Sequence, residues 1–284
     1  MKTKANERAF TLVELLVVIA VIAMLAVLVL PALAMSNDHG QAARCLSNLR
    51  QMGVGWLTYN GDNRGYFMGN LDEGAQPSSW YQTPIEWCPG RQDAGGQGPP
   101  ELSPPGSAVN LGYYWIEDGQ MYPYVKNCAV YLCPADYGTT LVGTTRCPQV
   151  RSYSMNLWVG TPTSIIQSLF STQPAYHLFL KETDVGNMGP ANLMLVMDEN
   201  SYSINDGMFV NLPSSGNWGD CPGSYHGNAG GINFADGHGE IHHWSDQAVL
   251  IPNSTHGWQY MNTPPQQQPA TDLQWLYSHS TVHY

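Results

Sequence analysis

The sequence predicts an α+β fold, in which a long N-terminal helix packs on a globular head built around an antiparallel β-sheet. An apolar segment at residues 15–35 contains twenty-one residues without a single charge. A helical period of apolar residues follows over residues 41–59. Short β-like segments separated by turn residues make up much of the remaining chain. The three patterns together indicate a transmembrane plus amphipathic helix followed by a β-rich head.

The apolar segment is long enough to anchor the chain in a membrane. A helix over residues 10–35 would span roughly 39 Å, whereas the hydrocarbon layer of a bilayer is about 30 Å thick. Lys2, Lys4 and Arg8 precede the segment, and basic residues tend to stay in the cytoplasm. We therefore expect a single pass through the cytoplasmic (inner) membrane, with the N-terminus inside and the head exported. The alternative is a secretory signal peptide cut after residues 32–34.

Glu14 is the unusual residue of this segment. A carboxylate near the centre of a membrane helix costs about 2.5–3.5 kcal/mol, and less near its edge. One interpretation is that Glu14 reaches the lipid headgroups of an ordinary anchor. The other is that it pairs, inside an assembled bundle, with a free amine made by cutting the chain before Phe10.

The residues Phe10-Thr11-Leu12, with Glu14 two positions further on, follow a short basic leader and open the apolar helix. In this arrangement the chain resembles the type IV pilin and type II secretion pseudopilin superfamily. The resemblance implies that a prepilin peptidase cuts between Ala9 and Phe10 and methylates the new amine of Phe10. The residue before the cut is usually glycine in that superfamily, and the alanine here predicts slower processing.

Pro31 lies inside the apolar segment. Proline removes one backbone hydrogen bond from a helix, so we expect a kink or local melting at this position. The resemblance implies that such a proline loosens the helix and lets subunits pack in a filament. The alternative is a bend of the kind that membrane helices tolerate without any special role.

Residue patterns and the resemblance together divide the chain into four parts. Residues 1–9 form the leader, and residues 10–35 form the transmembrane and filament-core helix. Residues 36–60 form an amphipathic helix that continues into the head, and residues 61–284 form the exported, pilin-like head. The head contains an irregular insertion rich in Gly and Pro at about residues 72–110.

The amphipathic helix has one apolar face that should pack on the sheet. Leu46, Leu49, Gly53 and Trp56 recur at spacings of three and four, which is the period of a helix. Cys45, Met52 and Tyr59 extend the same face. The turn residues at 61–65 should end the helix. The expected strands are residues 130–133, 152–156, 193–198, 231–234 and 239–244.

Composition excludes some functions and indicates others. The formal net charge is −11, and charged residues make up only 12% of the chain. Such an acidic protein is a poor candidate for nucleic-acid binding. All six cysteines (Cys45, Cys88, Cys128, Cys133, Cys147 and Cys221) fall on the exported side, where disulfides persist. We expect disulfides, with buried free thiols as the alternative; the absence of Cys-x-x-Cys pairs argues against a zinc ribbon.

A second motif lies in the head, where His226 precedes the pair Asp236-Gly237 by nine intervening residues. This spacing resembles the H-X9-DG signature of a large pilin-like family. Fragments elsewhere resemble the same family: Cys45 with residues 48–51, Cys133-Pro134-Ala135-Asp136 and residues 152–156. The first expected role is architectural, because Asp-Gly between two strands favours a type I′ hairpin turn with positive φ at both positions. His226 would then hydrogen-bond into the hairpin or hold the glycine loop before it.

A metal site is the competing interpretation of the same motif. Its candidate ligands are Asp198, His226, Asp236 and His238. Carboxylates suit calcium, whereas two histidines and an aspartate suit zinc or iron. Calcium is preferred here, because some secretion pseudopilins that the chain resembles stabilise a head loop with it. We otherwise expect no cofactor.

The predicted function is that of a structural subunit of a type IV pilus-like or type II secretion pseudopilus filament. The chain should not be an enzyme, because it contains no Gly-x-Ser-x-Gly elbow, His-Glu-x-x-His helix or Walker loop. The expected partners are copies of itself or other pilin-like subunits, a prepilin peptidase and an inner-membrane assembly platform. The filament would be periplasmic or lie at the cell surface.

Two alternative functions stay open. The nine Trp and sixteen Tyr residues would suit a membrane-anchored, exported module that binds glycans or proteins. A metal-dependent hydrolase using His226, Asp236 and Asp198 is the weaker alternative.

Overall fold

The structure, a computed structural model, describes residues 12–70, 86–89, 114–142, 145–170, 176–186, 188–213, 215–251 and 271–283. The chain divides into two compact units, Met1–Gly40 and Gln41–Tyr284. The predicted leader, with Ala9 and Phe10, lies outside the described residues. So does the predicted insertion, except for residues 86–89.

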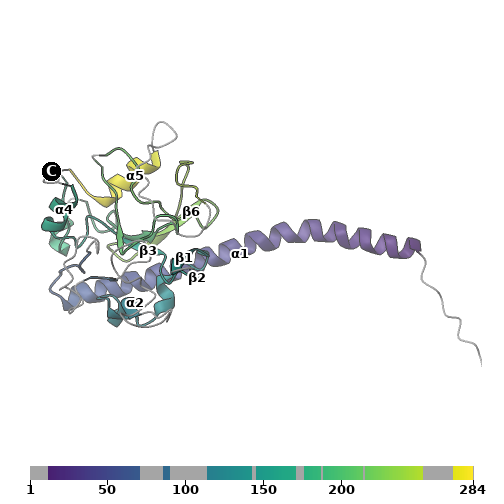
Figure 1. Cartoon of the computed structure of the whole chain (residues 1–284), viewed down its shortest axis with the longest axis horizontal. Helices are drawn as coiled ribbons and strands as arrows, with labels where there is room; N and C mark the ends of the chain where they lie inside the picture. Colours follow the sequence, from purple (N-terminus) through teal and green to yellow (C-terminus); the bar gives the residue numbers. More distant parts are fainter. Residues whose placement is uncertain are drawn as a thin grey trace, which may run out of the picture. The chain divides into compact units, whose positions relative to one another are not determined.

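The first element is a single long helix, α1 (Leu12–Asp62) (Figure 1). Its backbone stays helical through Pro31, so the local melting expected there does not occur in the structure. The turn predicted to end α1 is confirmed: Arg64 and Gly65 have φ angles of 59° and 77°. Gly65 N–H also donates to the carbonyl of Asn60 at 2.8 Å, which satisfies one of the last helical acceptors.

Among the residues that the structure describes, no helix combines the length and the apolar character that crossing a membrane requires.

The head contains short helices and seven strands among its described residues. Its helical elements are α2 (Tyr114–Asp118), α3 (Tyr122–Val125), the 3-10 turn η2 (Cys128–Tyr131), α4 (Thr163–Phe170), the 3-10 turn η3 (Glu182–Asp184) and α5 (Thr271–Ser280). Its strands are β1 (Thr139–Val142), β2 (Thr145–Pro148), β3 (Tyr153–Asn156), β4 (Met194–Asp198), β5 (Met208–Phe209), β6 (Ala229–Phe234) and β7 (Gly239–His243).

The main sheet has five strands in the order β5-β3-β4-β6-β7, and β1 with β2 forms a separate hairpin. The prediction of a wholly antiparallel sheet is wrong, because β5 runs parallel to β3. The other three pairings are antiparallel. A parallel neighbour requires a crossover, and the chain between β3 and β5 supplies it by passing through β4.

Four of the five predicted strand segments form strands, namely β3, β4, β6 and β7. The fifth prediction, a strand at residues 130–133, is wrong, because most of this segment belongs to the 3-10 turn η2 or follows it without strand pairing. The Asn127 side chain accepts a hydrogen bond from Ala129 N–H at 3.1 Å and caps this turn. Local capping therefore decides the conformation of a segment whose side chains alone suit a strand.

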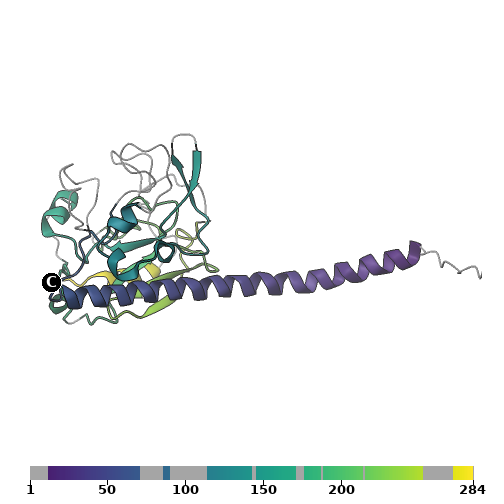
Figure 2. The same ribbon diagram turned by 90° about the horizontal axis from the view of Figure 1, so that it is seen from below.

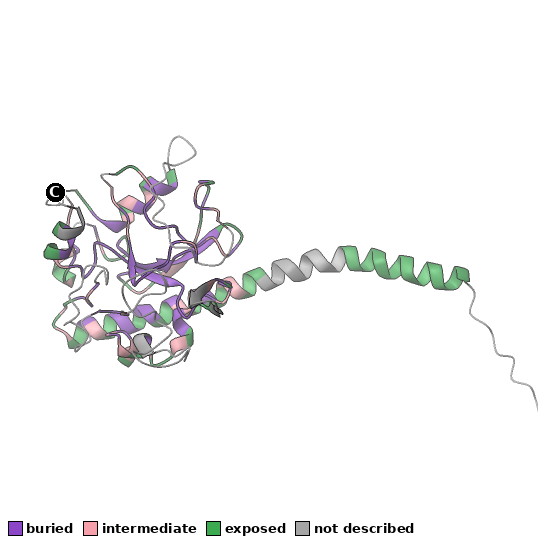
Figure 3. Cartoon of the chain, in the orientation of Figure 1, coloured by how far each residue is buried: buried purple, intermediate pink, exposed green. Residues whose placement is uncertain are grey.

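One face of the sheet is covered by the part of α1 that belongs to the head. Cys45, Leu49, Met52 and Trp56 of α1 are all fully buried, which confirms the predicted apolar face. A Cβ placed on Gly231 of β6 would lie 2.6 Å from Leu49 Cδ1, so this helix and this strand are in close contact. Figure 3 shows the buried residues of the head in purple and the first exposed turns of α1 in green.

The opposite face of the sheet is covered by α5. Ile232 and Phe234 alternate with the residues of β6 that face α1, and they pack with Leu273 and Leu276 of α5. Figure 1 shows the sheet between α1 and α5, and Figure 2, seen from below, shows α1 running across the head. The head is therefore a three-layer arrangement of helix, sheet and helix.

The expectation of disulfides is not confirmed for the described cysteine side chains. Cys45, Cys88, Cys128, Cys133 and Cys221 are free, and all except the partly exposed Cys128 are buried. For these five residues the structure shows the alternative of free thiols.

Candidate functional site

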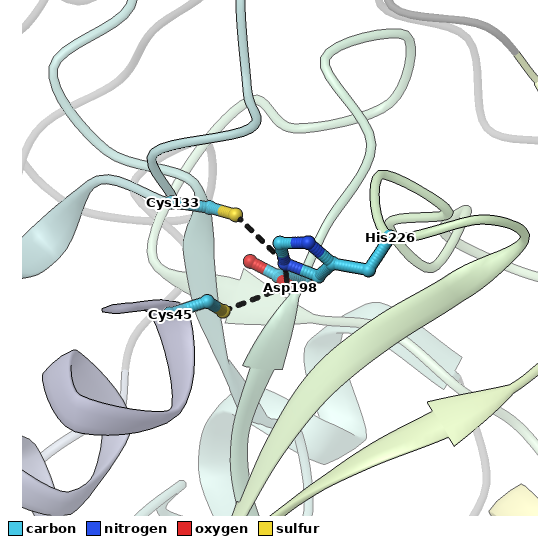
Figure 4. Close-up of side chains that lie close together, drawn as sticks. All are labelled: Cys45, Cys133, Asp198 and His226. Carbon is cyan, nitrogen blue, oxygen red and sulfur yellow. Dashed lines mark hydrogen bonds and ion pairs between the residues drawn. The ribbon is translucent and has the colours of Figure 1, made fainter. Parts of the chain in front are cut away.

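Four potential metal-ligand side chains meet in the centre of the head. They are Cys45 of α1, Cys133 after η2, Asp198 at the end of β4 and His226 before β6. One ligand atom from each residue lies within 4.8 Å of all the others. Figure 4 shows the four side chains converging from four separate segments. We call these four residues the central cluster.

The closest contacts within the central cluster link each thiol to a different partner. Cys45 Sγ lies 3.3 Å from Asp198 Oδ2, and Cys133 Sγ lies 3.2 Å from His226 Nε2. His226 Nε2 and Asp198 Oδ2 are 3.9 Å apart. These three separations link the four side chains in the order Cys133, His226, Asp198, Cys45.

The central cluster is closed to solvent. Cys45, Cys133 and Asp198 are 0% exposed and His226 is 7% exposed. Asp198 Oδ1 makes no hydrogen bond with any residue that the structure describes. Burying a carboxylate oxygen without a partner costs free energy, so this atom requires a physical explanation.

The position of Asp198 follows from its place on the sheet. It ends the buried strand β4, and its Oδ2 accepts a hydrogen bond of 2.7 Å from Gly231 N–H on the neighbouring strand β6. A Cβ on residue 231 would lie 2.7 Å from Cys45 Sγ and 3.1 Å from Asp198 Oδ2. Only glycine at this position lets β6 come so close to the cluster.

Cys133 is held by a rigid turn over residues 133–136. Asp136 N–H donates to the Cys133 carbonyl at 2.9 Å, and Cys133 N–H donates to Ser152 Oγ at 3.0 Å. The Ser152 hydroxyl in turn donates to Asp136 Oδ2 at 2.7 Å. This network gives the Cys-Pro-Ala-Asp fragment a physical role, because it fixes the direction of the Cys133 thiol.

The pKa values of the two thiols and of the carboxyl in the central cluster are raised. Burial raises the pKa of the Cys133 thiol well above its usual value and the pKa of the Asp198 carboxyl to about 7. At Cys45 a hydrogen bond with Cys133 lowers the pKa, but burial and the Asp198 carboxylate outweigh it and the pKa is raised. The protein alone therefore favours the protonated, neutral forms of Cys45, Cys133 and Asp198.

The structure brings together only two of the four predicted metal ligands. Asp198 and His226 belong to the central cluster, whereas Asp236 and His238 form a separate pair at the surface, with Oδ1 and Nδ1 2.6 Å apart. The two groups lie at opposite ends of β6. The expected contact of His226 with the start of the hairpin is confirmed for its backbone, because His226 N–H donates to the Ala229 carbonyl of β6 at 3.0 Å. Its imidazole ring instead contacts Cys133.

The Asp236-Gly237 turn is architectural, but its geometry differs from the prediction. Gly237 has a φ of 89°, whereas Asp236 is not among the residues with positive φ, so the turn is not of type I′. Gly237 N–H donates to the Phe234 carbonyl at 2.9 Å, and Asp236 Oδ1 accepts from His238 N–H at 3.0 Å. The loop is longer than a two-residue hairpin, and a single left-handed glycine is enough to close it.

Helix α1 packs directly against the same turn. A Cβ on Gly53 would lie 2.8 Å from the carbonyl oxygen of Gly237. Because this neighbour is backbone, it has little freedom to move away. The two glycines therefore set how closely α1 approaches the hairpin between β6 and β7.

Adding a methyl group at this contact should destabilise the head. We expect Gly53→Ala to lower the free energy of unfolding by about 1–3 kcal/mol, since overpacking forces the helix away from the turn. Gly61→Ala is a matched control in α1, because its Cβ would meet nothing within 4 Å. It should leave stability unchanged or raise it by up to about 1 kcal/mol. Urea unfolding of the full chain in detergent measures both; equal stabilities would contradict the close contact.

Cys45 and Cys133 are the site residues that sequence reasoning assigned to disulfides. The sequence did contain a sign that they belong together: the fragments around Cys45 and Cys133 resemble the same pilin-like family as the motif that begins at His226. Their convergence with Asp198 needs the folded sheet and was not visible in local spacing. Glu14 lies in the first turn of α1, in the other unit of the chain, and Pro31 lies further along the same helix.

The N-terminal segment of the chain matches a known protein family. Residues 4–30 match the family described as the prokaryotic N-terminal methylation motif. No curated protein and no solved structure matches the chain. The matched segment includes Ala9, Phe10 and Glu14, and it implies processing by a prepilin peptidase. The chain thus carries a prepilin-type N-terminal methylation motif, which supports a pilin-like or pseudopilin-like protein.

Proposed function

We propose that this protein is a structural subunit of a type IV pilus-like or type II secretion pseudopilus filament. The match of residues 4–30 to the N-terminal methylation motif carries the proposal. In this account the chain is inserted in the inner membrane, trimmed between Ala9 and Phe10 by a prepilin peptidase, and methylated at Phe10. An inner-membrane assembly platform then adds it to a periplasmic or cell-surface filament.

The surface of α1 supports this role. From Leu12 to Val27 its large apolar side chains are exposed, with Leu12 at 75% and Met24 at 72%. An uncovered apolar surface of this kind needs lipid or neighbouring protein around it. A membrane supplies the first before assembly, and the equivalent helices of other subunits supply the second afterwards.

Glu14 would set the axial position of each subunit. Its carboxylate is the acidic group in the first turn of α1, close in sequence to the amine that cleavage would create on Phe10. In a filament core without water, burying a carboxylate alone is costly, and the amine of a neighbouring subunit is its natural partner. Dispersion packing of apolar helices is similar at many registers, so the charge pair selects one of them.

The head has a structural role in this proposal, and we assign it no catalysis. The central cluster gathers the reactive side chains of four segments of the described head, but three of its four residues are 0% exposed. A substrate would have to enter a fully packed interior to reach them. The H-X9-DG motif is likewise proposed to act through architecture, with Gly237 seating α1 and His226 completing the cluster.

The mature N-terminus tests the proposal directly. Mass spectrometry of the protein from cells that contain a prepilin peptidase should find chains beginning with N-methyl-Phe10. Cells without the peptidase should yield chains that keep the leader. Because Ala9 replaces the usual glycine, Ala9→Gly should accelerate cleavage in a pulse-chase measurement.

Two outcomes would contradict the proposal. Chains beginning near Met35 would indicate an ordinary secreted protein that discards its apolar segment. Chains that keep the leader in the presence of an active peptidase would indicate a plain membrane anchor. The Ala9→Gly variant separates slow cleavage from absent cleavage, since only a true peptidase substrate should respond to it.

A further inference from the structure

We propose that the central cluster binds one zinc ion, which fastens α1 to the sheet of the head. The ligands would be Cys45 Sγ, Cys133 Sγ, one carboxylate oxygen of Asp198 and His226 Nε2, whose ligand atoms already lie within 4.8 Å of one another. This site is independent of filament assembly and of processing at the N-terminus.

The spacing of the four atoms fits tetrahedral coordination. Zinc bonds of about 2.3 Å to sulfur and 2.0–2.2 Å to nitrogen or oxygen place neighbouring ligand atoms roughly 3.3–3.8 Å apart. The observed separations of 3.2, 3.3 and 3.9 Å fall close to this range. The remaining pairs are within 4.8 Å, so the side chains need to close in by about 1 Å at most.

Asp198 provides independent support. Its carboxyl is completely buried, and Oδ1 has no hydrogen-bond partner among the described residues, although Oδ2 has two. A cation between the four side chains would offset the free-energy cost of burying this carboxylate. Gly231 fits the same picture, because any larger residue would fill the space next to Cys45 Sγ and Asp198 Oδ2.

The donor set selects zinc over the calcium preferred from the sequence. Calcium takes six to eight oxygen ligands, whereas this cluster offers two sulfurs, one imidazole nitrogen and one carboxylate. Thiolates with imidazole in a tetrahedral arrangement suit zinc. Binding would release the two thiol protons and the proton of the Asp198 carboxyl to solvent, since only thiolates and the carboxylate coordinate the metal.

A zinc ion here would be structural. Structural zinc sites have four protein ligands and no open position, whereas catalytic sites keep one position for water or substrate. Cys45 and Asp198 are 153 residues apart in sequence, and Cys133 and His226 are 93 residues apart. One ion would therefore join four distant segments and hold the helix of the head against the end of β4.

Metal content of matched cysteine variants tests the site. The full chain, purified in detergent without chelators, should contain about one zinc ion per molecule by plasma mass spectrometry. Cys45→Ala and Cys133→Ala should each lose at least about nine-tenths of it. Cys221→Ala is the matched control, because Cys221 is an equally buried free thiol outside the cluster, and it should keep the full zinc content.

Spectroscopy and selective metal removal keep the test valid if a variant fails to fold. Wild-type protein reconstituted with Co²⁺ should show thiolate charge-transfer bands and the visible absorption of tetrahedral cobalt. Treatment with 1,10-phenanthroline should lower its melting temperature by at least about 10 °C. The 1,7 isomer has the same ring system but does not chelate, so it should leave the melting temperature unchanged.

Several results would overturn the proposal. These are a wild-type protein that stays metal-free after dialysis against zinc, a disulfide between Cys45 and Cys133, or bound zinc that survives in both ligand variants. A stoichiometric metal other than zinc at these residues would overturn the identity of the ion. None of these results bears on the mature N-terminus, so failure here is distinguishable from failure of the filament proposal.

Discussion

Glu14→Ala chains should be processed, methylated and folded like the wild type, yet be missing from filaments. The substitution removes the carboxylate proposed to pair with the Phe10 amine of a neighbouring subunit. Leaving one partner of a buried charge pair alone costs about 3–5 kcal/mol. Since each 1.4 kcal/mol is a factor of ten, incorporation should fall by roughly a hundredfold or more.

The effect is measured by comparing sheared filaments with membranes in an immunoblot of cells that express each variant. Glu14→Gln keeps the shape of the side chain but not its charge, and it should fail like Glu14→Ala. Asp38→Ala removes another exposed carboxylate of the same helix, outside the apolar stretch, and it should assemble normally. Wild-type levels of Glu14→Ala in the filament fraction would exclude the charge pair as the determinant of register.

Helix α1, which contains both Glu14 and the face that packs on the sheet, was predictable from sequence, because the pattern that indicates it is local. Apolar residues at helical spacing identified the face containing Leu49 and Trp56, and both residues are fully buried. Turn chemistry at residues 61–65 located the end of the helix for the same reason. A pattern read over a few turns is enough when the element is long and packs along one face.

Strand order was not predictable in the same way. The short strand β5 has only two residues, Met208 and Phe209, which is too few to show alternation. Its parallel pairing with β3 is created by the path of the chain across the sheet, so no local pattern encodes it. At residues 130–133 a local pattern was misleading, since the cap at Asn127 imposes a 3-10 turn over residues 128–131, part of a segment that suits a strand.

For the central cluster, the sequence indicated two of the ligand residues but not which residues lie together in the fold. Sequence reasoning selected Asp198 and His226, and it placed Asp236 and His238 with them because they are near in sequence. The structure groups the first two with Cys45 and Cys133 instead. Spacing along one hairpin cannot reveal ligands contributed by a helix more than a hundred residues away.

The packing of α1 on the core predicts a large loss of stability when Trp56 is truncated, whatever the function of the protein. Trp56 is completely buried, and its ring centroid lies 4.9 Å from that of Phe67. In the amide orientation that satisfies both groups, Asn60 accepts a hydrogen bond of 2.9 Å from the Trp56 indole N–H. Trp56→Ala would leave both a large cavity and a buried amide without its donor.

We expect Trp56→Ala to lower the free energy of unfolding by about 3–5 kcal/mol, as for other buried aromatic residues replaced by alanine. For a chain of this size the melting temperature should fall by roughly 6–20 °C. Leu57→Ala is the neighbouring control, because Leu57 is 43% exposed, and it should cost under about 1 kcal/mol. Circular dichroism of the full chains in detergent, followed through thermal and urea unfolding, measures both changes.

A Trp56→Ala chain that melts within a few degrees of the Leu57→Ala chain would show that α1 does not pack on the head through this face. The zinc content of the same samples shows whether α1 stays in place on the sheet. If the helix stays in place and only the core loses free energy, Cys45 should still reach the central cluster and the folded protein should keep its metal. Loss of both stability and metal would mean that Trp56 is needed to hold the whole helix on the sheet. Core packing and metal binding would then be coupled through the position of α1.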